Sequence, residues 1–262
     1  MMLGDVFLDA EVASAYRQRA PYPAETFDIL KSLLVGPRTV LDVGAGTGAL
    51  ARRMLSFADR VDAVDPSEAM IAQGRRLAGG DDRRLRWIHG SAETAPLDPP
   101  YGLITAGASL HWMDARVVMP RFAASLAPGA TLAVLEIDDD SPPWRERSVE
   151  IIKRYEEQRT SRLTGEPIPA HHDDLSGLIA EIEGAGLFLR RGEHRTSPVV
   201  LRRTVDEYLE FLHSTSTLAR IRLGPRTDPF DEDMRELFSR LGVSVLEFSV
   251  TGVVIYGQPV AT

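Results

Sequence analysis

Three glycines at alternate positions follow a short, mostly apolar run. Gly44, Gly46 and Gly48 come directly after Val40–Val43, and a pattern with helical spacing follows them. Glycine adopts left-handed backbone conformations at no steric cost and lets a ligand approach the main chain closely. The free N–H groups at the start of a helix favour an anionic group. This segment therefore predicts a strand, a tight turn and a helix that together bind a ligand.

Two acidic residues narrow the kind of ligand. Asp65 ends the next apolar run, where a carboxylate can accept hydrogen bonds from the hydroxyls of a ribose. Asp42 precedes the first glycine, and a carboxylate there repels a pyrophosphate and favours an ammonium group. The lysine of a triphosphate-binding loop is missing, and the third glycine comes one position early for a dinucleotide fingerprint. The pattern favours a ribose-containing ligand with an ammonium group.

A histidine and a tryptophan follow the fourth apolar run. His111 and Trp112 come shortly after residues 103–106, which we expect to form a strand. Histidine has an ordinary pKa of about 6.5, so His111 is a candidate general base at neutral pH. The alternative is that His111 caps the next helix and Trp112 fills the core. The sequence leaves both interpretations open.

The glycine segment resembles motif I of the class I methyltransferases, which bind S-adenosylmethionine. The resemblance continues in order through several further segments, namely Tyr16, Tyr22-Pro23, Val64–Met70, His89–Glu93 and Leu126–Leu132. The His111-Trp112 pair resembles a group of small-molecule enzymes that includes the trans-aconitate methyltransferase-like proteins. Ser91 stands where the family usually places an aspartate that holds the adenine amine.

The resemblance implies a set of cofactor-binding residues and a smaller set around the methyl acceptor. We expect the cofactor to contact Asp42, Gly44, Ala45, Gly46, Gly48, Asp65, Pro66, Met70, Ser91, Ala92 and Tyr16. Met70 has a core position as its alternative, and surface packing is the alternative for the two tyrosines. We expect the acceptor to contact Tyr22, His111, Trp112 and Trp144, with His111 as the catalytic residue. Trp144 is included on its position alone, as are Tyr155, Phe211, His213 and Thr215.

The elements that must hold these residues alternate between strand and helix. Short apolar runs predict seven strands, at residues 39–43, 61–64, 85–88, 103–106, 131–137, 187–191 and 246–256. Helical spacing predicts helices at 25–34, 49–58, 67–78, 117–126 and 144–158, and three more around residues 175–182, 204–212 and 234–241. Ser67 and the capping box at Thr204–Glu207 mark two helix starts, and Pro128-Gly129 is expected to end a helix. The pattern predicts a doubly wound, mostly parallel α/β sheet.

We expect one domain over residues 1–262, with cap segments at 139–185 and 196–230 above the carboxyl ends of the strands. Arg17, Arg19, His194 and Arg195 are candidates for binding an acidic acceptor near this cap, with ordinary surface charge as the alternative. His171-His172-Asp173-Asp174 suggests a metal only weakly, because adjacent ligands rarely converge without distant partners. A helix start capped by Asp173 is favoured there.

Composition excludes several classes of function. The 262-residue chain has no cysteine and a net charge of −8, which excludes thiolate chemistry and disfavours a nucleic-acid partner. It has no apolar run long enough to span a membrane and no signal-peptide pattern, so a cytoplasmic location is expected. The oligomeric state is left open.

The sequence predicts transfer of a methyl group from S-adenosylmethionine to an oxygen, nitrogen or carbon of a small molecule, such as a secondary metabolite. Two alternatives remain. The fold can catalyse a different reaction, such as cyclisation or hydrolysis, or the chain can be a cofactor-binding regulatory subunit.

Overall fold

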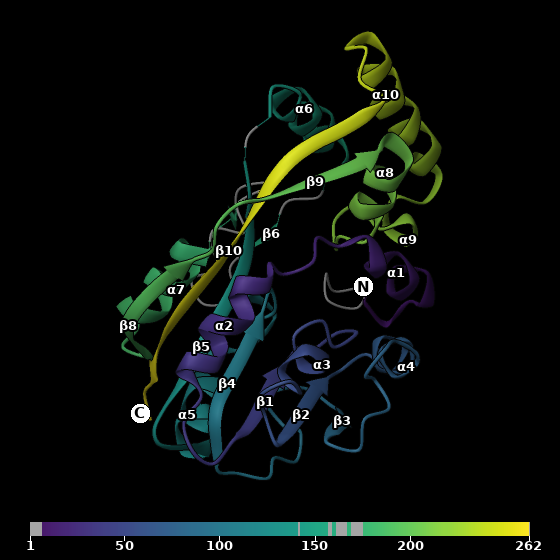
Figure 1. Cartoon of the computed structure of the whole chain (residues 1–262). Helices are drawn as coiled ribbons and strands as arrows, with labels where there is room; N and C mark the ends of the chain where they lie inside the picture. Colours follow the sequence, from purple (N-terminus) through teal and green to yellow (C-terminus); the bar gives the residue numbers. More distant parts are fainter. Residues whose placement is uncertain (1–6, 141, 157–158, 161–166, 169–174, 262) are drawn as a thin grey trace.

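The structure, a computed structural model, describes residues 7–140, 142–156, 159–160, 167–168 and 175–261. An eight-stranded sheet runs through it, with helices on both faces (Figure 1). The strand order is β3-β2-β1-β4-β5-β10-β8, and β9 also pairs with β10. Short strands β6 (Arg159–Thr160) and β7 (Pro167–Ile168) form a separate pair. The predicted α/β fold with a mostly parallel sheet is confirmed.

The first five strands are parallel, so their carboxyl ends meet at one edge of the sheet. They are β1 (Thr39–Val43), β2 (Arg60–Asp65), β3 (Leu85–His89), β4 (Tyr101–Gly107) and β5 (Leu126–Asp139). Helices cover both faces, and consecutive side chains of β1 are therefore buried, which explains its nearly continuous apolar sequence. Strand β1 lies between β2 and β4, and this order brings the glycine turn, Asp65 and the segment after β4 together.

Each face of the sheet has its own apolar core. On one face, Phe27 and Leu30 of α2 (Ala24–Leu33) pack with Met54 of α3 (Ala51–Met54). On the other face, α5 (Ala115–Ser125) and α7 (Leu175–Gly184) contribute Phe122 and Ile179. Helix α4 (Glu68–Arg76) contacts β2 and β3. Ser67 is confirmed as its N-cap residue, because the Ser67 hydroxyl accepts a hydrogen bond from the N–H of Met70 at 3.1 Å.

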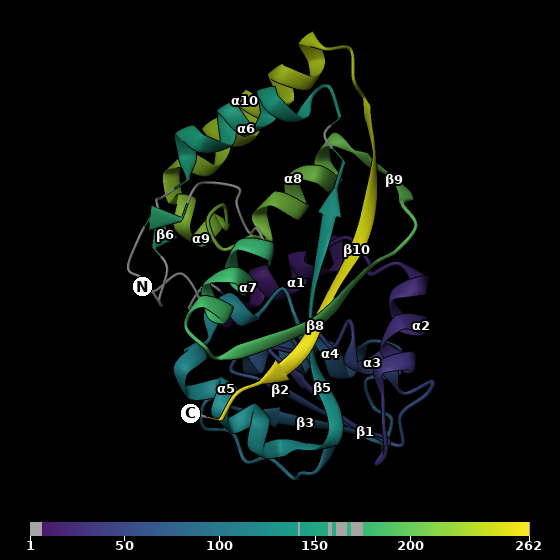
Figure 2. The same ribbon diagram turned by 90° about the vertical axis from the view of Figure 1, so that its left-hand side faces the viewer.

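The last long strand, β10 (Val245–Pro259), runs from the cap helices down to the lower part of the sheet (Figure 2). It is antiparallel to β5, and it pairs its second half with β8 (Phe188–Arg195) and its first half with β9 (Val199–Thr204). Strands β5, β9 and β10 therefore extend beyond the carboxyl ends of the shorter parallel strands and support helices there.

Four helices above this edge form a group that we call the cap. They are α6 (Arg145–Tyr155), α8 (Val205–His213), α9 (Arg220–Leu223) and α10 (Thr227–Arg240), and α6 lies along α10 (Figure 2). The cap has a separate apolar core, which includes Phe230 and Phe238. Helix α1 (Ala10–Ala15) and the short helix η2 (Tyr16–Gln18) lie between the cap and the sheet domain, since α1 contacts both α4 and α8.

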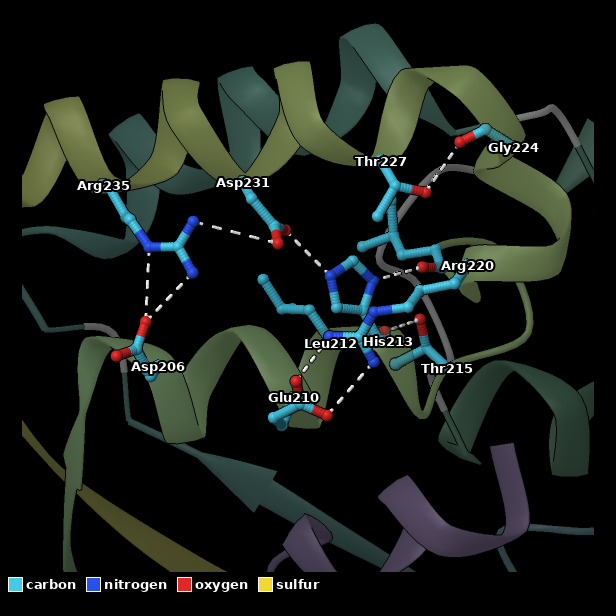
Figure 3. A network of polar contacts seen from close by, with 11 residues as sticks. Asp206, Glu210, Leu212, His213, Thr215, Arg220, Gly224, Thr227, Asp231 and Arg235 are labelled. Atoms are coloured by element: carbon cyan, nitrogen blue, oxygen red, sulfur yellow. Dashed lines mark hydrogen bonds and ion pairs between the residues drawn. The ribbon is translucent and has the colours of Figure 1, made fainter. Parts of the chain in front are cut away.

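A buried histidine joins two cap helices (Figure 3). His213 is 1% exposed; its Nδ1 lies 2.8 Å from the carbonyl oxygen of Leu218, and its Nε2 lies 2.8 Å from the Asp231 carboxylate. Nearby, Arg220 pairs with Glu210 of α8. These bonds hold α8, α9 and α10 in a fixed arrangement, so His213 is a structural residue and the predicted acceptor contact is not supported.

Several sequence expectations are wrong in detail. The helix expected over 49–58 is only four residues long, Ala51–Met54, because turns occupy the residues on either side. Helix α5 ends at Ser125, and Pro128-Gly129 lies at the start of β5 instead of ending a helix. Strand β9, helices α1 and α9, and the short helices η3 (Leu110–Trp112) and η4 (Gly224–Arg226) were not expected.

The expected cap segments are also partly wrong. Helix α7, expected in the cap, packs on the sheet, because Leu175, Ile179 and Ile182 join the sheet's apolar core. Residues 199–204 form a strand of the main sheet. Residues 171–174, the proposed helix start, lie outside the described residues. None of the described helices is long and apolar enough to cross a membrane.

Candidate functional site

The three glycines of the turn after β1 all have left-handed backbone conformations, with φ of +64°, +55° and +76° at Gly44, Gly46 and Gly48. A β-carbon added at Gly44 would lie 2.4 Å from the Ser109 side chain, and one at Gly48 would lie 2.6 Å from the Trp87 ring. At Gly46 the nearest atom would be a ring carbon of Tyr16 at 3.6 Å. Close packing therefore requires glycine at positions 44 and 48, whereas a β-carbon at Gly46 would meet the Tyr16 ring only at ordinary contact distance.

Asp65 connects the end of β2 to this turn. One carboxylate oxygen accepts the N–H of Gly46 at 2.7 Å, and the other accepts the N–H of Ser67 at 2.8 Å. Burial raises the pKa of Asp65, and the two N–H bonds and His89 oppose that shift. Each carboxylate oxygen has two lone pairs, so the group can still accept the hydroxyls of a ribose. The geometry thus fits the nucleoside part of S-adenosylmethionine.

Asp42 lies beneath the turn, 2% exposed. Its carboxylate accepts a hydrogen bond from the Thr105 hydroxyl at 2.8 Å. Burial raises the pKa of Asp42 to about 7, although the bonds from Thr105 and the N–H of Ala51 lower it. Asp42 therefore links β1 to β4 and to the start of α3, and it places an acid that titrates near neutrality close to the turn.

The stability of the protein should depend on pH through Asp42. Its pKa is about 7 in the folded protein and 3.8 ordinarily, so between these values the folded state holds a proton that the unfolded chain loses. The free energy of unfolding should therefore fall as pH rises from about 4 to 7, by up to roughly 1.4 kcal/mol per pH unit. The amide of Asp42→Asn does not titrate. The free energy of unfolding of this variant, relative to that of the wild type, should therefore increase as pH rises through that window. Thermal unfolding at several pH values measures this difference, and a constant offset between the two proteins would contradict the assignment.

Four rings connect the glycine turn to the segment after β4. The ring of Phe7 lies 6.2 Å from that of Tyr16 and 5.7 Å from that of Trp112. Trp112 in turn lies 4.6 Å from the ring of His111 in η3. The Ser109 hydroxyl donates to the carbonyl of Val43 at 2.7 Å and so joins the ends of β1 and β4. The structure therefore brings Tyr16, Trp112 and His111 to the same edge of the sheet, as predicted for a site there.

Tyr22 reaches the same edge from the start of α2. Gly107, the last residue of β4, is glycine because an added β-carbon would lie 2.6 Å from the Tyr22 hydroxyl. Burial raises the pKa of Tyr22 strongly, and the charge of Glu136 raises it further.

Glu136 is a half-buried acid near the end of β5, and the sequence analysis missed it. Its signal was its place at the end of a predicted strand, the same signal that identified Asp65.

Comparison with known proteins agrees with this geometry. A family model described as a methyltransferase domain matches residues 40–129, which contain the glycine turn, Asp65 and His111. An uncharacterized methyltransferase of Mycobacterium tuberculosis is 30% identical over 215 residues, which cover 79% of this chain and 86% of that protein. The chain belongs to the class I S-adenosylmethionine-dependent methyltransferases. The trans-aconitate methyltransferase-like group is not confirmed.

Two further similarities are more limited. The demethylmenaquinone methyltransferase of Clavibacter sepedonicus is 28% identical over 119 residues, which cover 45% of this chain and 48% of that protein. A solved structure from Anaeromyxobacter dehalogenans, a proposed type II methyltransferase, has a TM-score of 0.66 at 24% identity. It covers 92% of this methyltransferase and 97% of the other chain, and the likeness shows the shared fold.

The remaining cofactor candidates of the methyltransferase lie around the ends of β1, β2 and β3. Ala45 and Ala92 are buried in the two cores of the sheet. Met70 is 2% exposed and packs with residues of α1, while Pro66 is exposed and its carbonyl lies 3.0 Å from His89 Nε2. The Ser91 hydroxyl lies 3.0 Å from that of Thr94. Their contacts with a cofactor stay predictions.

Other candidates lie away from this edge. Trp144 is 7% exposed and packs against the rings of Tyr208, Phe238 and Phe248, so it is a packing residue of the cap and an acceptor contact is not supported. Arg195 pairs with Asp138 and Glu193 on the outer part of β8, and the neighbouring His194 stacks on Tyr256. In the described part of the chain, no group of three His, Asp or Glu side chains could hold a metal ion.

Proposed function

We propose that this methyltransferase transfers a methyl group from S-adenosylmethionine to an oxygen, nitrogen or carbon atom of a small molecule. The observation that carries the proposal is the turn at Gly46, where an added β-carbon would meet only the Tyr16 ring within 4 Å and whose N–H donates to the Asp65 carboxylate. Bound S-adenosylmethionine supplies an electrophilic methyl group on a positively charged sulfur. The protein has mainly to align a nucleophile with that methyl group, which is orientation work.

On the cofactor side, Asp65 binds the ribose and the main chain of the glycine turn allows close approach. Tyr16 covers the turn, because its ring faces the α-carbon of Gly46. Asp42 favours positive charge nearby whenever it is ionised. Because burial raises its pKa to about 7, this attraction strengthens as pH rises through neutrality.

On the acceptor side, Tyr22, His111 and Trp112 line the end of β4. The raised pKa of Tyr22 keeps its phenol protonated, so it can donate a hydrogen bond to the acceptor. When the acceptor is a hydroxyl, His111 removes the proton that the oxygen must lose, a role that histidine performs well near neutral pH. A carbon or basic nitrogen nucleophile needs less of this help.

Two observations support a small acceptor. The cap and the N-terminal helix α1 cover the edge at which the strands end (Figure 1), and the net charge of −8 opposes binding to a nucleic acid. One relative is named for the acceptor demethylmenaquinone, which agrees with small-molecule methylation.

Removal of the Asp65 carboxylate tests the cofactor assignment. Asp65→Ala should weaken S-adenosylhomocysteine binding, measured by calorimetry, by roughly ten- to a hundredfold, the usual value of a hydrogen bond to a charged group. Asp81→Ala is the matched control, since Asp81 is an exposed acid outside this edge. Tight binding of NADH with no response to S-adenosylmethionine would exclude the proposed cofactor.

Product analysis tests the reaction itself. Incubation with S-adenosylmethionine and a panel of small acceptors should yield a methylated acceptor together with S-adenosylhomocysteine. A rearranged or hydrolysed acceptor with the cofactor unchanged would instead assign a different reaction to the fold. Cofactor binding without turnover over a broad panel would favour a regulatory subunit.

A further inference from the structure

Two arginines from distant segments meet on one aromatic ring in the cap. The guanidinium of Arg203 in β9 lies 4.9 Å from the ring centre of Phe211 in α8, and that of Arg19 lies 5.9 Å from the same centre. Arg203 also lies 5.8 Å from the ring of Phe248. Arg19, which follows η2, donates a hydrogen bond to the carbonyl of Ser214 at 3.1 Å. The pair therefore joins the N-terminal segment to the cap.

Arg203 is buried, and no acceptor for its Nη1 lies among the described residues. It is 8% exposed, and within the described ranges its Nη1 has no hydrogen-bond partner and its guanidinium forms no ion pair. The buried Nε of Arg19 also lacks a partner in the described chain. A buried arginine normally pairs with a carboxylate, because an uncompensated charge in a low-dielectric environment is unfavourable. The arrangement consequently provides unpaired donors for an anion.

Neighbouring groups do not neutralise this charge. Glu207 is exposed, and its carboxylate accepts bonds from the N–H and hydroxyl of Thr204 in the capping box of α8. Burial lowers the pKa of Arg203, the positive charge of Arg19 lowers it further, and Glu207 opposes both. Contacts with the faces of two rings stabilise the cation only partly, since they leave its N–H groups unbonded.

The arginine pair is continuous with the proposed site. Arg19 lies 5.1 Å from the ring centre of Tyr16, whose edge faces Gly46 of the glycine turn. The charge of Arg19 also lowers the pKa of Tyr22, whose hydroxyl lies against the end of β4. An anion bound by Arg19 and Arg203 would therefore lie on the cap side of the residues that surround the methyl acceptor.

We infer that Arg203 and Arg19 bind a carboxylate of the methyl acceptor, so that this methyltransferase acts on small organic acids. The inference rests on the proposed function and deepens it, because it names the substrate class. S-adenosylmethionine has a carboxylate of its own, which presents the same chemistry. The experiment therefore measures cofactor binding and acid binding separately.

The test uses thermal shift with S-adenosylhomocysteine present and a panel of acids: acetate, succinate, citrate, benzoate and phenylacetate, each matched with its primary amide. At least one acid, but not its amide, should raise the melting temperature of the wild type. Arg203→Met and Arg19→Met should each weaken binding of that acid at least about tenfold, the value of a charge-assisted contact. Arg202→Met is the matched control, since Arg202 is an exposed neighbour that pairs with Glu247.

The Arg203→Met protein should melt no lower than the wild type, because an apolar side chain replaces an unpaired buried charge. Its affinity for S-adenosylhomocysteine, measured by calorimetry, should remain within about twofold of the wild-type value. If no acid exceeds its amide, or if both arginine variants retain acid binding, the inference is overturned. A loss of S-adenosylhomocysteine affinity in the Arg203 variant would assign the arginines to the cofactor and also overturn it. Failure of the wild type to bind S-adenosylhomocysteine would instead reject the proposed function on which the inference rests.

Discussion

Gly46→Val should lower the affinity for S-adenosylhomocysteine by about a hundredfold while the protein still folds. An added β-carbon would lie 3.6 Å from the Tyr16 ring, so a small group fits, but a branched side chain would fill the space between the turn and that ring. Overfilling a packed space costs roughly 1–3 kcal/mol, which corresponds to as much as a hundredfold in affinity. Calorimetry measures the affinity, and thermal unfolding shows that the variant is folded.

Gly129→Val is the matched control for backbone strain. Gly129 is exposed at the start of β5, has φ of +82°, and has no atom within 4 Å of an added β-carbon. Both variants place valine in a left-handed conformation, which costs roughly 1–2 kcal/mol, so both should melt at a lower temperature. Only the Gly46 variant should lose the ligand. If it binds as well as Gly129→Val does, the cofactor does not approach this turn closely.

His111→Ala should lower kcat by roughly 10²–10⁴ with a hydroxyl acceptor, the usual scale of general acid–base catalysis. Cofactor affinity should remain nearly unchanged, because the proposal assigns His111, which follows β4 and lies next to Trp112, to the acceptor and Asp65, which ends β2, to the ribose. The wild-type rate should fall as pH decreases through the pKa of the essential histidine, since the protonated ring cannot accept a proton.

Steady-state kinetics and thermal unfolding of the same variant separate three roles for His111. A loss confined to the acceptor KM would show that the side chain only lines the site, because uniform binding is then removed. A loss of about 1 kcal/mol in stability with unchanged kinetics would show a helix cap. His194→Ala serves as control, because His194 is exposed on β8 and stacks on Tyr256. An unchanged kcat, when chemistry limits the rate, would exclude His111 as a base.

Local sequence determined the framework of this methyltransferase. Features that depend on residues close together in the chain were predictable. They are the strands β1 to β5, the N-cap of α4 at Ser67 and the capping box of α8. The left-handed turn at Gly44, Gly46 and Gly48 was predictable for the same reason, since only glycine adopts these backbone conformations at no steric cost. The parallel order then placed the glycine turn, Asp65 and His111 at one edge, as predicted.

Only the tertiary structure decided what surrounds that edge. Trp144 and His213 looked like acceptor contacts from their positions, but packing of α6, α8 and α10 buries both inside the cap. Arg203 had no local signal, because its neighbours come from segments far apart in the chain. The spacing of apolar residues along the sequence indicates which face of a helix or strand is buried. Which other element packs against that face depends on the chain topology. For that reason the placement of the glycine turn, Asp65 and His111 at one edge was predictable from the sequence, whereas the contacts among β9, α8 and the N-terminal segment depended on the tertiary structure.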